Sequence, residues 1–105
     1  MKTSEFFKQK TVLSLEVFPP KRTAPVDTIY KTLDELKGMT PDFISVTYGA
    51  GGSENSRATL EIASSIKHRY GIESVAHIPC LHLTKEDAAE ILLQLKAHQI
   101  ENILA

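Results

Sequence analysis

Short apolar runs alternate with helix-like segments along this chain, and that alternation limits the folds that it can adopt. Three runs have the length and composition of buried strands, and they lie at Val12–Phe18, Phe43–Tyr48 and Ser74–Cys80. Apolar residues at helical spacing follow each run, over Asp27–Lys37, over Glu54–Arg69 and from Thr84 onward. Asn102–Ala105 has the pattern of a fourth strand that is cut short. Regular strand–helix alternation predicts a parallel sheet built from right-handed crossovers.

Glycine and a capping pattern mark the ends of the predicted helices. Gly38 and Gly71 follow the first two helices, where each is expected to supply a left-handed stop. Thr84 begins the third helix, and Asp87 three residues later makes a near match to a capping box. The apolar residues expected to form the buried stripes are Val26, Ile29, Leu33 and Leu36, then Leu60, Ala63, Ile66 and Tyr70, then Ile91, Leu92 and Leu95.

Two layouts of a parallel sheet compete, and the period of the strands favours one of them. An open doubly wound sheet is covered by helices on both faces, whereas a barrel has helices only outside. Alternation gives each strand one apolar face, formed by Leu13, Leu15 and Val17, by Ile44 and Val46, and by Ala76 and Ile78. The opposite face carries Glu16, Thr47 and His77 toward the carboxyl ends of the strands. Polar residues that converge on one concave surface favour the barrel.

The length of the chain bounds how much of a barrel it can form. A barrel of eight strand–helix units needs about 250 residues. The 105 residues hold three units and the start of strand four of a (βα)8 TIM barrel, which is therefore incomplete as given. We expect residues 1–105 to be the amino-terminal part of a single barrel domain with no internal boundary.

The composition of the chain argues against several classes of binding partner. The formal net charge of −1 gives no sign of a nucleic-acid or acidic-membrane partner, and no apolar stretch is long enough to span a bilayer. Cys80 is the only cysteine, which fits a reducing cytoplasm. Because His77 and Cys80 fall on opposite faces of a strand, no metal site is expected, and Cys80 is interpreted as a small buried apolar residue.

Glu16 is the strongest candidate for chemistry. It interrupts an apolar run directly ahead of Pro19 and Pro20, which end the strand, so its carboxyl lies near the end where α/β proteins place active sites. Burial in an apolar cup favours the protonated form of a carboxyl group, which can then act as a general acid near neutral pH. The alternative is a structural glutamate paired with a lysine or arginine.

Two further segments have a functional and a structural interpretation. The glycine-rich run from Thr47 to Ser53 lets backbone N–H groups approach a ligand closely, but it equally fits a flexible strand-to-helix turn. His77 either contacts a ligand beside Glu16 or is a core histidine bonded to the backbone.

Four segments together resemble the methylenetetrahydrofolate reductase family. They are Ser14–Lys21 (SLEVFPPK), Phe43–Ser53 (FISVTYGAGGS), Ala76–Cys80 (AHIPC) and Ile100–Ala105 (IENILA). The resemblance extends over nearly the whole chain in order. It implies a flavin-dependent (βα)8 barrel in which NADH or NADPH gives a hydride to FAD. The flavin then reduces 5,10-methylenetetrahydrofolate to 5-methyltetrahydrofolate for methionine synthesis in the cytoplasm.

The resemblance also implies roles for individual residues. Glu16 would be the general acid that assists opening of the folate five-membered ring, and Thr47 would lie near the nicotinamide. Tyr48, Ala50 and His77 would contact FAD. The complete protein would bind a folate substrate and could form a homo-oligomer.

One departure and one alternative accompany this resemblance. Gln99 stands where the family commonly has a glycine that ends the third helix, and a left-handed cap with a side chain costs about 1–2 kcal/mol. The later strands that would hold most FAD and folate contacts are absent, so the isolated chain is expected to be inactive. The alternative is a non-catalytic α/β binding or interaction module without flavin.

Overall fold

A computed structural model describes residues 1–20, 27–48, 53–81 and 83–105 of the chain. In order along the chain, the elements are α1 (Thr3–Phe7), β1 (Ser14–Val17), α2 (Asp27–Leu36), the 3₁₀ helix η1 (Lys37–Met39), β2 (Phe43–Val46), α3 (Ser53–His68), β3 (Glu73–His77), α4 (Lys85–Ala97) and β4 (Asn102–Leu104). The predicted order of strands and long helices is confirmed, and each strand ends one to three residues earlier than predicted. The short helix α1 was not predicted.

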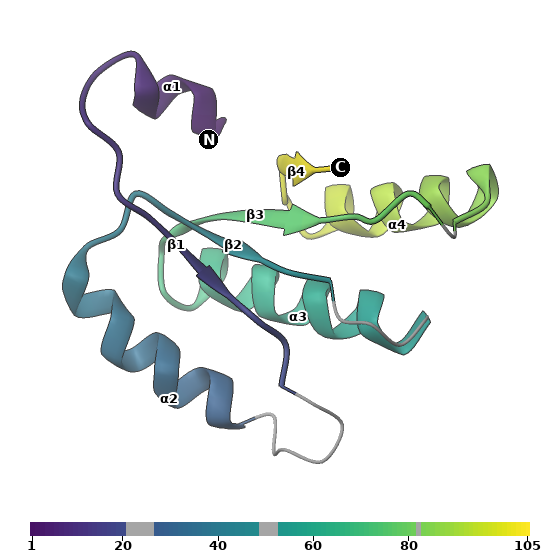
Figure 1. The fold of residues 1–105 in the computed structure, drawn as a ribbon, viewed down its shortest axis with the longest axis horizontal. Helices are drawn as coiled ribbons and strands as arrows, with labels where there is room; N and C mark the ends of the chain where they lie inside the picture. Colours follow the sequence, from purple (N-terminus) through teal and green to yellow (C-terminus); the bar gives the residue numbers. More distant parts are fainter. Residues whose placement is uncertain (21–26, 49–52, 82) are drawn as a thin grey trace.

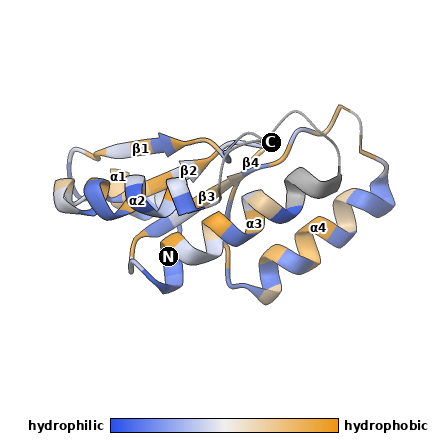
Figure 2. Ribbon diagram, turned by 90° about the horizontal axis from the view of Figure 1, so that it is seen from below, coloured by the Kyte–Doolittle hydropathy of each residue, from blue (hydrophilic) through white to orange (hydrophobic). Residues whose placement is uncertain are grey.

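The four strands form one parallel sheet in the order β1-β2-β3-β4. Figure 1 shows these strands side by side, and Figure 2 shows α3 and α4 packed against one face of the sheet. Consecutive strand order with helices on a single face is the arrangement of a barrel wall, and it differs from a doubly wound sheet. The architecture is therefore α/β with a parallel sheet, consistent with part of a TIM barrel.

The core lies between the sheet and the helices. It is one buried apolar cluster, made of Val17, Ile29, Leu33, Ile44, Val46, Ile62, Ala63, Ile66, Ala76, Ile78, Leu95 and Ile100. Strand alternation therefore assigned the core-facing side chains of Val17, Ile44, Val46 and Ala76 correctly. Two assignments were wrong, because Leu92 is 46% exposed beside β4 and Leu13 is 44% exposed ahead of β1.

The helix ends follow the sequence signals at two positions and depart from them at a third. Gly71 has φ 67° after α3, and Thr84 forms a complete capping box with Asp87 at the start of α4, as predicted. The prediction that Gly38 is a left-handed stop was wrong. Gly38 lies inside η1, and Thr40 takes the left-handed conformation instead, with φ 50°. The predicted stripe residue Val26 lies outside the described residues.

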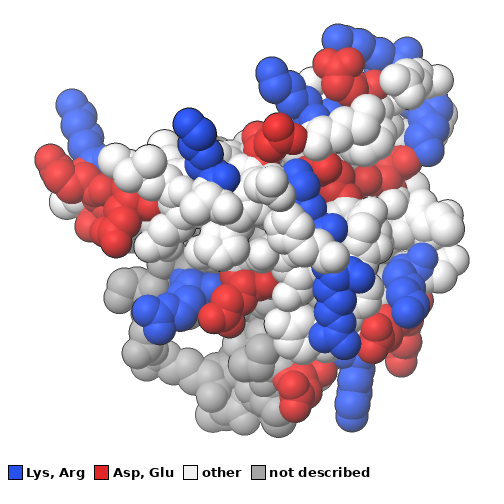
Figure 3. Space-filling view, turned by 180° about the vertical axis from the view of Figure 1, so that it is seen from behind, with Lys and Arg blue, Asp and Glu red and all other residues white. Residues whose placement is uncertain are grey.

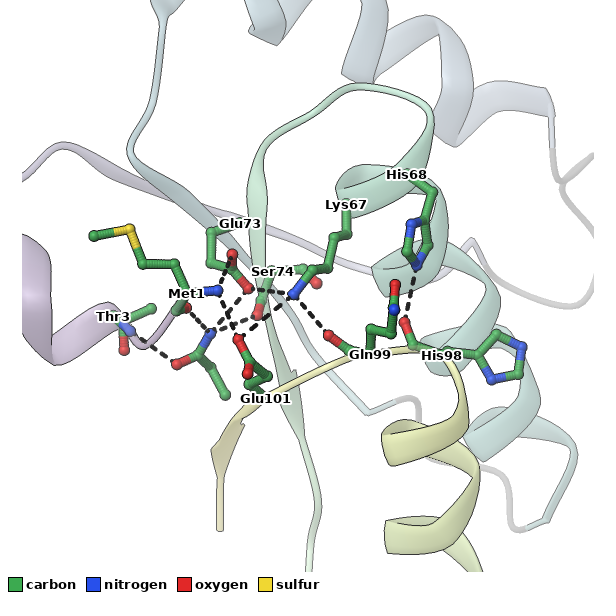
Figure 4. Close-up of polar contacts among 10 residues, drawn as sticks. Met1, Thr3, Lys67, His68, Glu73, Ser74, His98, Gln99 and Glu101 are labelled. Carbon is green, nitrogen blue, oxygen red and sulfur yellow. Dashed lines mark hydrogen bonds and ion pairs between the residues drawn. The ribbon is translucent and has the colours of Figure 1, made fainter.

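A polar cluster ties the amino-terminal segment to the amino-terminal ends of β3 and β4 (Figure 4). The amino group of Met1 lies 2.9 Å from a carboxylate oxygen of Glu73 and 2.6 Å from one of Glu101. These hydrogen bonds, with Glu101 the larger cause, raise the pKa of the amino group and lower the pKa of Glu101. Lys67 joins the cluster through Glu73 at 3.1 Å. The cluster holds α1 against the end of the sheet opposite to Glu16.

The charged side chains on the face seen in Figure 3 are mixed in sign. Lysine and arginine alternate with aspartate and glutamate over this face, in keeping with the net charge of −1. None of the described helices combines the length and apolar character needed to cross a membrane.

Candidate functional site

Glu16 projects from β1 on the face of the sheet that the helices leave uncovered. The burial pattern along β1 alternates, with Val17 buried against the helices and Glu16 exposed on the other side. The Glu16 side chain is 48% exposed, so the expectation that it lies in an apolar cup is wrong for this chain. The physical reason is that no described segment covers this face of the sheet above β1. The placement of Glu16 near the carboxyl end of its strand agrees with the sequence analysis.

Ser45 holds the Glu16 carboxylate from the neighbouring strand. The two residues are register partners in the β1–β2 ladder, so their side chains leave the sheet side by side on one face. The Ser45 hydroxyl donates a hydrogen bond to Glu16 Oε2 at 3.2 Å. Ser45 lies two residues before Thr47 and so shares the polar face predicted for that strand, but the sequence analysis did not name it as a site residue.

His77 reaches the same carboxylate from β3. Ser45 pairs with Val75 in the β2–β3 ladder, so His77, two residues further along, shares the face of Ser45 and lies nearer the carboxyl end. His77 Nε2 lies 3.6 Å from Glu16 Oε2, which is beyond hydrogen-bond distance but short enough for an ion pair when the imidazole is protonated. The structure thus brings Glu16 and His77 together across β2.

The Nε2 atom of His77 has unused hydrogen-bonding capacity. This atom is shielded from solvent and forms no hydrogen bond with any of the described residues. A buried ring nitrogen without a partner is rare in folded proteins, because leaving a polar group unsatisfied costs free energy. The polar atom that lies near it is Glu16 Oε2 at 3.6 Å, so His77 and Glu16 form one polar pair on this face of the sheet.

Thr47 is fixed through its backbone at the end of β2. Its N–H donates to the carbonyl of Val17 at 3.0 Å, which extends the β1–β2 ladder, and its carbonyl accepts from Thr59 Oγ1 at 3.0 Å. Thr59, buried on α3, was missed by sequence analysis because nothing in its helical context marks a hydroxyl that bonds outside the helix. Alternation from Ser45 places Thr47 on the same face as Glu16.

The remaining predicted residues divide between described and undescribed segments. Tyr48 is half-buried directly after Thr47, whereas Ala50 and most of the glycine-rich loop lie outside the described residues. Cys80 is exposed, so its interpretation as a buried apolar residue is wrong; it lies three residues beyond the end of β3, outside the regular alternation of the strand. Among the described residues, no group of three or more histidine, cysteine or acidic side chains could hold a metal ion.

These side chains can exchange protons with a bound molecule. A carboxyl group held by a hydroxyl, beside an imidazole, can donate or accept a proton at the carboxyl ends of parallel strands. That edge is where enzymes built on parallel α/β sheets place their active sites. Fold and site together define an α/β protein with an acid–imidazole pair at the position of an α/β active site.

Comparison with known proteins identifies the family. The sequence profile described as methylenetetrahydrofolate reductase matches residues 2–105. The 5,10-methylenetetrahydrofolate reductase of Pectobacterium carotovorum is 36% identical over 93 residues, covering 89% of this chain and 31% of the relative. The Escherichia coli enzyme of the same name is 34% identical over 93 residues, with the same coverage. The chain belongs to the methylenetetrahydrofolate reductase family, whose members are oxidoreductases.

A plant relative matches over the same part of the chain. Methylenetetrahydrofolate reductase (NADH) 1 of Arabidopsis thaliana is 34% identical over 96 residues, which are 91% of this chain and 16% of the relative. The chain therefore spans between about a sixth and a third of the length of the curated relatives that it matches.

Proposed function

We propose that residues 1–105 form the amino-terminal part of an FAD-dependent (βα)8 barrel that reduces 5,10-methylenetetrahydrofolate to 5-methyltetrahydrofolate. In this proposal the segment works within a longer polypeptide in the cytoplasm, with NADH or NADPH as the hydride donor. The observation that carries it is the contact of Glu16 with Ser45 and His77 at the carboxyl ends of the parallel strands. Membership of the reductase family supports the choice of substrate.

Glu16 is the proton donor of the proposed reaction. Its carboxyl would protonate the nitrogen that leaves when the folate five-membered ring opens, and general acid catalysis of this kind contributes about 10²–10⁴-fold in rate. No described helix covers Glu16 on its face of the sheet, and its side chain is 48% exposed, so a substrate could approach it from that side. The half-exposed carboxyl would lose its contact with water when folate covers it.

The cofactor-binding roles in this proposal are assigned to His77, Tyr48, Ala50 and Thr47. Bound FAD would carry a hydride from the nicotinamide to the folate carbon. His77 fits this group because its Nε2 atom lacks a partner among the described residues and borders the site. Tyr48 and Ala50 would supply further FAD contacts, and Thr47 would lie near the nicotinamide.

Substitution of Glu16 in the longer reductase tests the proposal. Glu16→Gln keeps the shape and still accepts the Ser45 hydrogen bond, but it removes the transferable proton. Reduction of the flavin by NADH should stay within about twofold of wild type, and folate turnover should fall at least about 100-fold. Stopped-flow absorbance of the flavin separates the two half-reactions.

A matched control uses Glu90, which is exposed on α4. Glu90→Gln should leave both half-reactions unchanged. Unchanged folate turnover in Glu16→Gln would refute the role of Glu16. A folded, colourless protein that takes up no FAD would instead favour the alternative of a non-catalytic α/β module.

A further inference from the structure

Both contacts that described residues make with the Glu16 carboxylate converge on one oxygen. The Ser45 hydroxyl donates to Oε2 at 3.2 Å, and His77 Nε2 lies 3.6 Å from the same atom. The other oxygen, Oε1, forms no hydrogen bond or ion pair with the described residues. The two oxygens of this carboxylate are therefore chemically distinct before any ligand binds.

Ser45 is better placed than His77 to fix the carboxylate. It lies in β2, which is paired on both sides, with Glu16 and Val75 as its register partners. A serine side chain is short, so a hydroxyl on a doubly paired strand has little freedom to move. Glu16 has a long side chain on β1 that is half exposed, and without an anchor its carboxylate would sample several rotamers.

We propose that Ser45 is a positioning residue that anchors Oε2 of Glu16 and so presents Oε1 as the oxygen that delivers the proton. A carboxyl oxygen that already accepts a hydrogen bond is the poorer place for the acidic proton, which therefore resides on Oε1. During ring opening the O–H bond at Oε1 breaks, and the electron pair of the cleaved carbon–nitrogen bond takes up the proton on nitrogen. Glu16 is left as a carboxylate. This inference rests on the proposed function.

The hydrogen bond from Ser45 also strengthens as the reaction proceeds. Hydrogen bonds to an ionised carboxylate are stronger than those to a neutral carboxyl group, so Ser45 stabilises the charge that develops on Glu16. An interaction that is stronger in the transition state than in the ground state raises the rate of the chemical step. Reduction of the flavin by the nicotinamide needs no proton from Glu16, so Ser45 should not affect that half-reaction.

Two substitutions of Ser45 in the longer reductase test this role. Ser45→Ala removes the hydroxyl, and we expect kcat for folate reduction to fall about tenfold, which corresponds to about 1.4 kcal/mol. The KM for folate and the rate of flavin reduction by NADH should stay within about twofold of wild type. Ser45→Thr keeps a hydroxyl at the same position and should restore kcat to within about threefold of wild type.

Ser74 provides the matched control. It is a fully buried serine on the neighbouring strand β3, alternates to the face opposite Val75, and its hydroxyl makes no hydrogen bond with described residues. Ser74→Ala should leave both half-reactions unchanged.

The outcomes separate this inference from the proposed function. The positioning role is supported if Ser45→Ala lowers kcat for folate reduction without changing flavin reduction, and if Ser45→Thr restores that kcat. Full folate turnover in Ser45→Ala overturns the role while leaving the proposed function intact. Equal loss of both half-reactions in Ser45→Ala would show a structural role only, and would also overturn the inference. A wild-type protein that retains FAD but never reduces folate overturns both proposals.

Discussion

Asn102 Nδ2 donates a hydrogen bond to Glu73 Oε1 at 3.1 Å, which links the amino-terminal ends of β4 and β3. The same amide group donates to the carbonyl of Met1 at 2.9 Å, and its oxygen accepts from the N–H of Thr3 at 2.8 Å. Asn102 is 8% exposed, and each of these bonds is partly buried. One side chain thus connects the first residues of the chain to the last strand.

We expect Asn102→Ala to lower the free energy of unfolding by about 1–3 kcal/mol, because it leaves buried polar groups without partners. Urea unfolding followed by far-ultraviolet circular dichroism measures the change. Gln94→Ala is the control, since Gln94 is an exposed amide on α4, and it should change stability by less than about 0.5 kcal/mol. Equal stability of the two variants would show that the Asn102 contacts do not hold the structure.

His77 offers a test of flavin binding that does not depend on catalysis, and it rests on the proposed function. His77→Leu removes the ring nitrogen that has no partner among the described residues. We expect the affinity for FAD to fall about tenfold, the equivalent of one lost hydrogen bond. Titration of the flavin-free reductase with FAD, followed by quenching of flavin fluorescence, measures the affinity.

His68→Leu is the control for this titration. His68 is exposed at the end of α3, and its ring bonds the carbonyl of His98 at 2.9 Å, remote from Glu16. If both variants bind FAD as tightly as wild type, His77 makes no contact with the cofactor.

The sequence was sufficient to predict which faces the strand residues occupy. Side-chain alternation has a period of two whatever surrounds the strand, so Glu16 and His77 could be assigned to one face before their distance was known. The register was not accessible, because the pairing of Glu16 with Ser45 joins residues 29 positions apart. Ser45 became a site residue only when that register was known.

Burial and the amino-terminal helix also depended on tertiary contacts. Glu16 and Cys80 were expected to be buried because apolar residues flank them, yet exposure depends on which segments cover a position. The helix α1 has only five residues, too few for a helical period, and its cluster with Asn102 and Glu73 joins distant parts of the chain. The left-handed backbone of Gln99, by contrast, was predicted without any tertiary contact, because the family resemblance alone indicated a left-handed cap at this position.

Gln99 and Gly71 form a reciprocal pair for testing left-handed backbone strain. Gln99 has φ 60° after α4, and Gly71 has φ 67° after α3. Gln99→Gly should raise the free energy of unfolding by about 0.5–1 kcal/mol, because relief of strain outweighs the entropy that glycine loses on folding. Its carbonyl would still accept the hydrogen bond from Lys67 Nζ at 2.6 Å.

Gly71→Ala should have the opposite effect, a loss of about 1 kcal/mol. A Cβ atom at Gly71 would meet nothing within 4 Å, so this loss would come from the backbone alone. Thermal melts of both variants and wild type measure the two changes. A Gln99→Gly variant less stable than wild type would mean that the side chain of Gln99 outweighs its strain.

Asp42 couples the stability of the fold to pH. Its carboxylate bonds Lys10 and accepts the N–H of Leu13 at 3.0 Å, and these contacts, the first being the larger, lower its pKa below the usual value. A carboxyl group whose pKa is lower in the folded state stabilises that state above its unfolded pKa of about 3.9. This contribution is lost as the pH falls through the folded pKa.

Asp42→Asn should therefore remove part of the acid dependence of stability. We expect wild type to be more stable than this variant at pH 6 and the difference to shrink toward zero as the pH falls below the lowered pKa of Asp42, where the carboxyl group is protonated in both states. Urea midpoints measured from pH 2 to pH 7 test this. Glu35→Gln is the control, because Glu35 is exposed on α2. A difference between wild type and Asp42→Asn that stays constant over this pH range would contradict the role of Asp42, because a lost ion pair must titrate whereas a lost packing contact does not.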